Sequence, residues 1–288
     1  MKQIPTWIIT VLAFVFITNA CTKDKISTTV NSNDSVTIVK NASPGCLATV
    51  LSASQLLNTK SLTINGKINE KDFETMRDSM PNLHIIDLSV TQIEACKGLF
   101  FAKYLANTIP NYSFTQKHIT SLTLPNTITR IDDYAFSISL IDSTIVIPSS
   151  VTSIGNYAFD FCRNLTTMTI PSSVKILPTG IFDGCIKLRS VTIPSTLTTI
   201  GASAFFDCSA LSSITIPSSV KSIDSYAFEN CNGLKSVYVG STIPINLNSA
   251  NDVFANIPTN SILYVPKGSK AAYQAAAQWS AFSTIVEQ

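Results

Sequence analysis

The chain has 288 residues, of which 45% are hydrophobic and only 13% are charged, and its formal net charge is +2. Residues 120–240 carry 7 basic and 8 acidic side chains, scattered along the segment. No basic groove is present to release counterions from a nucleic acid, so a nucleic-acid partner is excluded and the surface is expected to be polar mainly through hydroxyl groups.

The N-terminus has the pattern of an export signal. Residues 7–17 form an apolar run that is too short to cross a bilayer but suits the core of a secretory signal. Ala20 precedes Cys21, and this end of the run resembles the lipobox of bacterial lipoproteins. The resemblance implies that residues 1–20 are a signal peptide and that Cys21 carries a lipid. An ordinary cleaved signal and a retained anchor are the alternatives.

The next segment is polar and rich in Ser, Thr and Asn. We predict that residues 21–45 are a flexible tether between the lipid on Cys21 and the fold. The protein would then be an outer-membrane lipoprotein that touches the membrane through its lipid anchor only. Lys23 to Lys25 match an acidic export tag weakly, so both the cell surface and the periplasmic face stay open.

Residues 46–120 are predicted to form an N-terminal cap with irregular repeats. Asn69 can cap a helix that runs through Phe73 to Met80, with Pro81 just beyond. A disulfide between Cys46 and Cys96 would connect the tether to the first repeats, and an oxidising compartment permits it. The pairing is one open possibility.

Residues 121–240 repeat with a period of 23 residues. Three residue types recur in register: Pro125, Pro148, Pro171, Pro194 and Pro217; Phe136, Phe159, Phe182, Phe205 and Phe228; Cys162, Cys185, Cys208 and Cys231. Such columns indicate one small unit stacked on copies of itself. In each unit an L-x-x-L-x-L pattern predicts a strand that ends at the proline, and the Tyr-Ala-Phe segment is predicted to form a turn of helix.

The strand pattern occurs nine times. Its first inward positions are Leu62, Ile86, Leu122, Ile145, Met168, Val191, Ile214, Val237 and Leu263. The predicted fold is therefore an α/β solenoid of the leucine-rich repeat type, with about nine parallel strands and helical caps at both ends. In the C-terminal cap, residues 241–288, Ser269 can cap a helix from Lys270 to about Gln278, and Trp279, Phe282 and Ile285 can close the last rung.

The unit from Ile147 to Leu165 resembles the BspA-like leucine-rich repeat family of bacterial surface proteins. The resemblance covers about residues 60–288 and implies an exported protein of a family in which some members are adhesins. It brings no catalytic motif. We accordingly expect no enzyme activity, no cofactor and no metal, and the two histidines, His84 and His118, lie in no hydrolytic motif.

The four repeat cysteines should point into the core. Buried free thiols are the favoured interpretation, with stacked disulfides or a metal site as alternatives.

The outward strand positions are the candidate binding surface. Thr169, Thr192 and Thr215 belong to a column of short hydroxyl side chains that ends in Tyr238 and Tyr264. A tyrosine pair on such a surface is typical of a contact anchor, although it could also be cross-strand packing beneath the cap. The expected function is adhesion or protein–protein interaction through the strand face, and the alternative is a glycan-binding accessory protein for nutrient capture.

Overall fold

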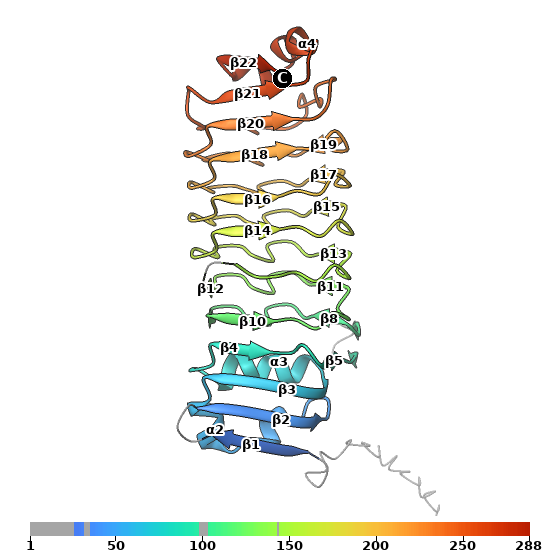
Figure 1. Cartoon of the computed structure of the whole chain (residues 1–288), viewed down its shortest axis with the longest axis vertical. Coiled ribbons are helices and arrows are strands. Elements are labelled where there is room, and N and C mark those ends of the chain that lie inside the picture. Colours follow the sequence, from blue (N-terminus) through green and yellow to red (C-terminus); the bar gives the residue numbers. More distant parts are fainter. Residues whose placement is uncertain (1–25, 32–34, 98–102, 143) are drawn as a thin grey trace, which may run out of the picture.

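The computed structural model describes residues 26–31, 35–97, 103–142 and 144–288. Its rungs stack into one elongated body, with β1 (Ser27–Asn31) near one end and α4 (Lys270–Ala275) at the other (Figure 1). Parallel pairing between successive rungs confirms the predicted leucine-rich repeat solenoid.

One face of the stack is made of parallel strands. In chain order they are β2 (Val36–Ala42), β3 (Ser61–Ile68), β4 (Ile85–Asp87), β10 (Ser121–Thr123), β14 (Thr167–Thr169), β16 (Ser190–Thr192), β18 (Ser213–Ile216), β20 (Ser236–Val239), β21 (Ile262–Val265) and β22 (Thr284–Glu287). We call this surface the strand face. Along β14 the side chains alternate between exposed threonines and the buried Met168, as the sequence predicted.

The strand expected around Ile145 is not formed. The Thr144 N–H bonds to the Asp142 carbonyl at 3.3 Å, which makes a local turn in place of a ladder with a neighbouring rung. Ile145 and Ile147 are still buried, so this rung keeps its place in the core although it adds no strand to the face.

A second series of two-residue strands follows the return arm of each rung. It comprises β8 (Thr108–Ile109), β11 (Arg130–Ile131), β13 (Ser153–Ile154), β15 (Ile176–Leu177), β17 (Thr199–Ile200) and β19 (Ser222–Ile223), with β5 (Thr91–Ile93) pairing with β3. Short pairs complete the described strands: β6 (Cys96–Lys97) with β7 (Lys103–Tyr104), and β9 (His118–Ile119) with β12 (Leu140–Ile141).

The Tyr-Ala-Phe segments form hydrogen-bonded turns and not the predicted turn of helix. Each turn contains two residues with positive φ four positions apart, such as Tyr157 at 55° and Phe161 at 48°. These left-handed residues point their N–H groups at the next rung: Tyr157 N donates to Thr179 O at 2.9 Å and Phe161 N to Asp183 O at 2.7 Å. A helix would turn the same groups back on their own rung.

The core is a column of stacked phenylalanines. The rings of Phe136 and Phe159 are 5.0 Å apart and nearly parallel, and those of Phe205 and Phe228 are 5.1 Å apart. The column continues to Phe73 at one end and to Phe254 and Trp279 at the other. No rung can bury its own ring, so each phenylalanine depends on its neighbours above and below.

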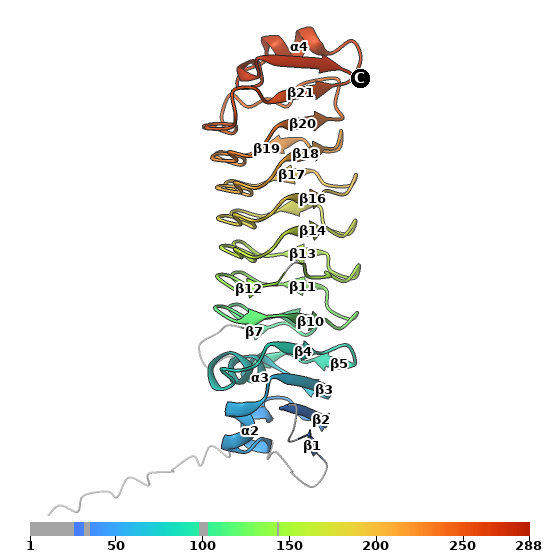
Figure 2. The ribbon, with the colours of Figure 1, turned by 60° about the vertical axis from the view of Figure 1, so that its left-hand side comes forward.

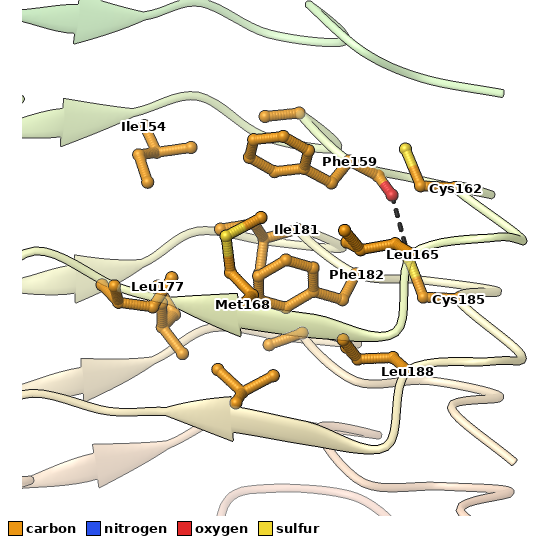
Figure 3. Close-up of a cluster of buried hydrophobic side chains, with 14 of the residues drawn as sticks. Ile154, Phe159, Cys162, Leu165, Met168, Leu177, Ile181, Phe182, Cys185 and Leu188 are labelled. Carbon is orange, nitrogen blue, oxygen red and sulfur yellow. Dashed lines mark hydrogen bonds between the residues drawn. The ribbon is translucent and has the colours of Figure 1, made fainter. Parts of the chain in front are cut away.

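The repeat cysteines are free and buried, as predicted. Each thiol donates to the backbone carbonyl of the phenylalanine in the preceding rung, for example Cys185 Sγ to Phe159 O at 3.0 Å (Figure 3). Ser139 makes the equivalent bond to Phe114 O in an earlier rung. The column therefore needs a small side chain with one donor, a requirement that a thiol meets without adding a strongly polar group.

Part of the predicted tether is folded. Residues 27–31 and 36–42 form β1 and β2, which are antiparallel, and β2 adds to the solenoid by pairing with β3. The reason lies in the alternation along β2: Thr37 and Val39 are buried, and the Thr37 hydroxyl is 2.6 Å from that of Thr59.

The N-terminal helices lie on the side of the stack where the turns of the later rungs gather (Figure 2). They are α1 (Leu47–Val50), α2 (Ala53–Asn58), α3 (Glu70–Glu74) and the π-helix η1 (Thr75–Ser79). Asn69 caps α3 as predicted, by accepting from Lys71 N at 3.0 Å. The Cys46–Cys96 disulfide is not formed, because Cys96 is a free thiol in β6 whereas Cys46 is buried beside α1.

At the C-terminal end, the short helix α4 is followed by the 3-10 helix η2 (Trp279–Ala281). Trp279, Phe282 and Ile285 are buried and close the last rung as predicted. Ser269 does not cap α4 with its side chain, because its hydroxyl donates to the Pro266 carbonyl; α4 also ends at Ala275, earlier than expected.

Candidate binding surface

The predicted surface residues lie in the columns that the sequence indicated. Thr169 pairs with Thr192 across β14 and β16, and Thr215 pairs with Tyr238, which in turn pairs with Tyr264. The three threonines are exposed. They lie in two separate sheets, because the strand ladder is interrupted between β16 and β18.

Tyr238 and Tyr264 form a tight stack on the strand face. Their ring centroids are 4.5 Å apart and the planes differ by 9°. Both side chains are half-buried, and neither hydroxyl bonds to another of the described residues. The next position in register is Val286 on β22, which is 38% exposed, so the stack continues as an apolar surface toward the C-terminal rung.

The polar groups of the last aromatic residues do not bond to this tyrosine pair. Tyr273 Oη donates to Ser241 O and Trp279 Nε1 donates to Ile245 O, both at 2.9 Å and both in the loop after β20. The stack of Tyr238 on Tyr264 is therefore cross-strand packing whose outer edge is open to a ligand.

The strand face also has apolar positions nearer the N-terminal end. Val146 is 75% exposed, in the rung that lacks a strand, and Ile85 on β4 is 42% exposed. A shallow depression is lined there by Ile145, Val146, Thr169 and Pro171. Among the described residues, the strands of this face carry few charged side chains: Lys40 on β2, Lys67 on β3, Asp87 on β4 and Glu287 on β22.

Beside the strand face runs a chain of polar side chains. His118 Nε2 lies 3.0 Å from Asp142 Oδ2, Asn164 donates to Asp142 at 3.2 Å, and Lys187 donates to Asn164 at 2.8 Å. His84 joins this chain through His118 O. These contacts link successive rungs, which makes the two histidines rim residues.

The chemistry available is that of a binding surface. Within the described ranges, no group of three or more His, Cys, Asp and Glu side chains is placed to hold a metal ion. Among the same residues, no helix combines the length and hydropathy that a membrane span requires. The predicted lipidation site Cys21 lies outside the described residues.

Sequence reasoning missed a second aromatic ladder, on the turns. Tyr112, Tyr134 and Tyr157 stack with centroids 5.2 Å apart at each step and with planes within 6°. Tyr157 then covers Gly180, whose missing side chain leaves room for the ring. The signal was present in the sequence, because Tyr134, Tyr157 and Gly180 follow the same 23-residue spacing as the phenylalanines.

Comparison with known proteins identifies the repeat. The family described as BspA type leucine rich repeat region matches residues 107–235 in six copies. No curated protein matches the chain. Three similar solved structures are leucine-rich repeat proteins.

One from Bacteroides ovatus is 17% identical, with 91% of this chain and 87% of that one covered and a TM-score of 0.46. The T. pallidum leucine rich repeat protein is 18% identical, with coverages of 84% and 79% and a TM-score of 0.40. A leucine rich cell surface protein from Faecalibacterium prausnitzii is 17% identical, with coverages of 90% and 96% and a TM-score of 0.29.

Proposed function

We propose that this BspA-like leucine-rich repeat protein is a cell-envelope adhesion protein that binds a protein ligand through its strand face. The observation that carries the proposal is the stack of Tyr238 on Tyr264, 4.5 Å apart, which ends a column of short hydroxyl side chains. Large rigid aromatic groups surrounded by small neighbours are the usual anchors of protein interfaces.

The geometry of the stack favours a protein over a glycan. A sugar ring binds an aromatic side chain by lying on the face of the ring. Here the facing sides of Tyr238 and Tyr264 cover each other, and the planes are nearly parallel. One face of each ring is therefore closed to a sugar, and the ring edges and hydroxyl groups suit the hydrogen bonds and van der Waals contacts of a protein partner.

Export and lipidation belong to the same proposal. The apolar run before Cys21 and the neutral, hydroxyl-rich surface support a protein held at the outer membrane by a lipid. Protease treatment of intact cells tests the membrane face, because a surface protein is cleaved and a periplasmic one is protected.

The test of the strand face uses a protein array and a glycan array in parallel. The purified chain is expected to bind protein spots, and soluble sugars should not compete. A Tyr238→Ala/Tyr264→Ala variant should lose binding at least about thirtyfold, as hot-spot residues worth about 2 kcal/mol or more predict. Tyr226→Ala is the matched control, because Tyr226 is an exposed tyrosine on the turn side of the stack.

The double variant must melt at the temperature of the control for the result to count as a binding effect. Unchanged binding by a folded double variant would remove the proposed anchor. Binding confined to the glycan array, with competition by free sugar, would instead support nutrient capture. Binding to proteins that is lost on Thr169→Ala/Thr192→Ala but not on the tyrosine variant would move the contact to the middle of the face.

A further inference from the structure

Lys117 occupies the core column that the later rungs fill with cysteine. It stands three residues after Phe114, as Cys162 stands three residues after Phe159, and its N–H makes the same turn bond, to Phe114 O at 3.1 Å. The side chain is 6% exposed. Like the thiols, it reaches back to the preceding rung, where its ammonium donates to Met80 O at 2.6 Å.

A buried ammonium has more donors than this contact uses. It carries three N–H groups, and among the described residues Met80 O is the single acceptor in place. Lys117 also lines a cleft between η1 and the turn at residues 112–116. Water or a ligand in this cleft is a source of acceptors for the remaining donors, which need partners because unsatisfied buried charge is costly.

The other walls of the cleft supply a second cation and a ring. The Arg77 guanidinium is held in place by Asp78, at 2.7 Å through both Nε and Nη2, and by Tyr112 O at 3.3 Å. Tyr112 is 47% exposed at the free end of the tyrosine ladder. Gln116 and His118 are exposed on the same wall.

The charged residues of the lining determine whether the cleft favours a negative or a positive ligand. Arg77 and Asp78 neutralise each other, His118 is paired with Asp142, and Lys117 is left as the uncompensated charge of the lining. Burial lowers the pKa of Lys117 below its ordinary value; Asp78 opposes this shift and Arg77 adds to it. A bound carboxylate would favour the charged form of Lys117. The cleft suits one negative group and would disfavour a multiply charged one, because Asp78 lies beside it.

We propose that this cleft binds a sugar bearing a carboxylate, with the carboxylate at Lys117 and the sugar ring against Tyr112. An aromatic ring together with an amide and an imidazole is a lining suited to the apolar face and the hydroxyls of a sugar. The site is separate from the strand face, so it goes beyond the proposed protein contact and can fail independently of it.

The test titrates the full chain with galacturonic acid, which carries one carboxylate, and with neutral galactose. The acidic sugar should bind, and the neutral sugar should bind at least about tenfold more weakly, since a hydrogen bond to a charged group contributes that much or more. Lys117→Met keeps the length of the side chain without its charge and should weaken the acidic sugar by about tenfold or more. Lys187→Met, which removes an exposed lysine outside the cleft, should bind as the wild type does.

Equal binding of the acidic sugar to a folded Lys117→Met variant would overturn the proposal, as would equal binding of the two sugars or no binding at all. If Lys117→Met does not fold, isotope-labelled wild-type protein decides. The amide signals that shift on titration must then include residues 115–118. Shifts confined to Tyr238 and Tyr264 would place the sugar on the strand face and overturn the cleft.

Discussion

Deleting one whole repeat should damage the protein less than placing one charge in its core. The deletion removes residues 171–193 and joins Ile170 to Pro194, which keeps every column in register. Phe159 then packs on Phe205 as it packed on Phe182. The contacts of Phe182 with Phe159 and Phe205, with ring centroids 5.9 and 5.5 Å apart, are replaced by one similar contact. The comparison variant is Phe182→Asp, at a fully buried position.

The two costs differ because of what each change leaves behind. Globular proteins are stable by about 0.05–0.15 kcal/mol per residue, so a 23-residue unit accounts for about 1–3 kcal/mol. Loss of a buried phenylalanine side chain alone costs about 3–5 kcal/mol. The aspartate at position 182 must in addition stay neutral or be buried unpaired, and a pKa raised by about 3 units adds about 4 kcal/mol. Phe182→Asp should therefore cost more than the deletion by about 4 kcal/mol or more.

Urea unfolding followed by circular dichroism measures both changes. The deletion variant should unfold in one transition with a slightly lower midpoint, and Phe182→Asp should be largely unfolded in the absence of urea. Phe182→Leu is the control for loss of the ring without charge, and it should lie between the two. A deletion variant less stable than Phe182→Asp would refute the account of the core as interchangeable stacked units.

Three further outcomes follow from single contacts. Cys185→Ser should be more stable than Cys185→Ala by about 1 kcal/mol in urea unfolding, because serine can keep the bond to Phe159 O. Burial and the nearby carboxylates of Asp160 and Asp207 raise the pKa of Asp183 to about 6, above its ordinary value of 3.8. The folded state therefore binds this proton more tightly than the unfolded state does. The stability of the fold should fall as the pH rises from 4 to 7. Asp183→Asn should remove that part of the pH dependence and stabilise the protein at pH 7 by about 1 kcal/mol, after allowance for solvent screening. If the dependence of stability on pH is the same in the variant, Asp183 is not the group responsible. Gly180→Ser should displace the Tyr157 ring, seen as changed tyrosine ring signals in NMR, whereas an unaltered ring would show that the space beneath it is not needed.

Regular positions could be predicted because each is fixed by its copies. The 23-residue spacing of Phe159 and Phe182 was enough to assign both rings to one column, and alternation around Met168 assigned the inner and outer sides of the strand. Burial of Cys185 followed from the same register. In a stacked fold, a residue that recurs at the period has the same neighbours in every rung, so one correct assignment fixes the others.

Local backbone geometry was harder to predict. The turn at Tyr157 needs left-handed conformations, which glycine, asparagine and aspartate usually signal, yet tyrosine and phenylalanine occupy them here. Their cost is offset by ring stacking and by hydrogen bonds to the next rung, which no single unit reveals. The folded part of the predicted tether was missed for a related reason: β2 is stabilised by β3, and its short alternating pattern stands among polar residues that resemble a linker.

The tyrosine stack and the Lys117 cleft lie where the 23-residue period is broken. Regular rungs are occupied by groups that satisfy one another, so Cys185 and Phe159 leave nothing over for a ligand. Lys117 follows the irregular segment that precedes the first regular rung, and its longer side chain must cross to Met80 to find the acceptor that a thiol finds nearby. Tyr238 and Tyr264 belong to rungs separated by 26 residues, where the hydroxyl column gives way to rings. Each rung packs only against its two neighbouring rungs. A residue that differs from the repeat pattern is therefore tolerated where the adjoining rung or cap packs around it, and such a residue is available for binding.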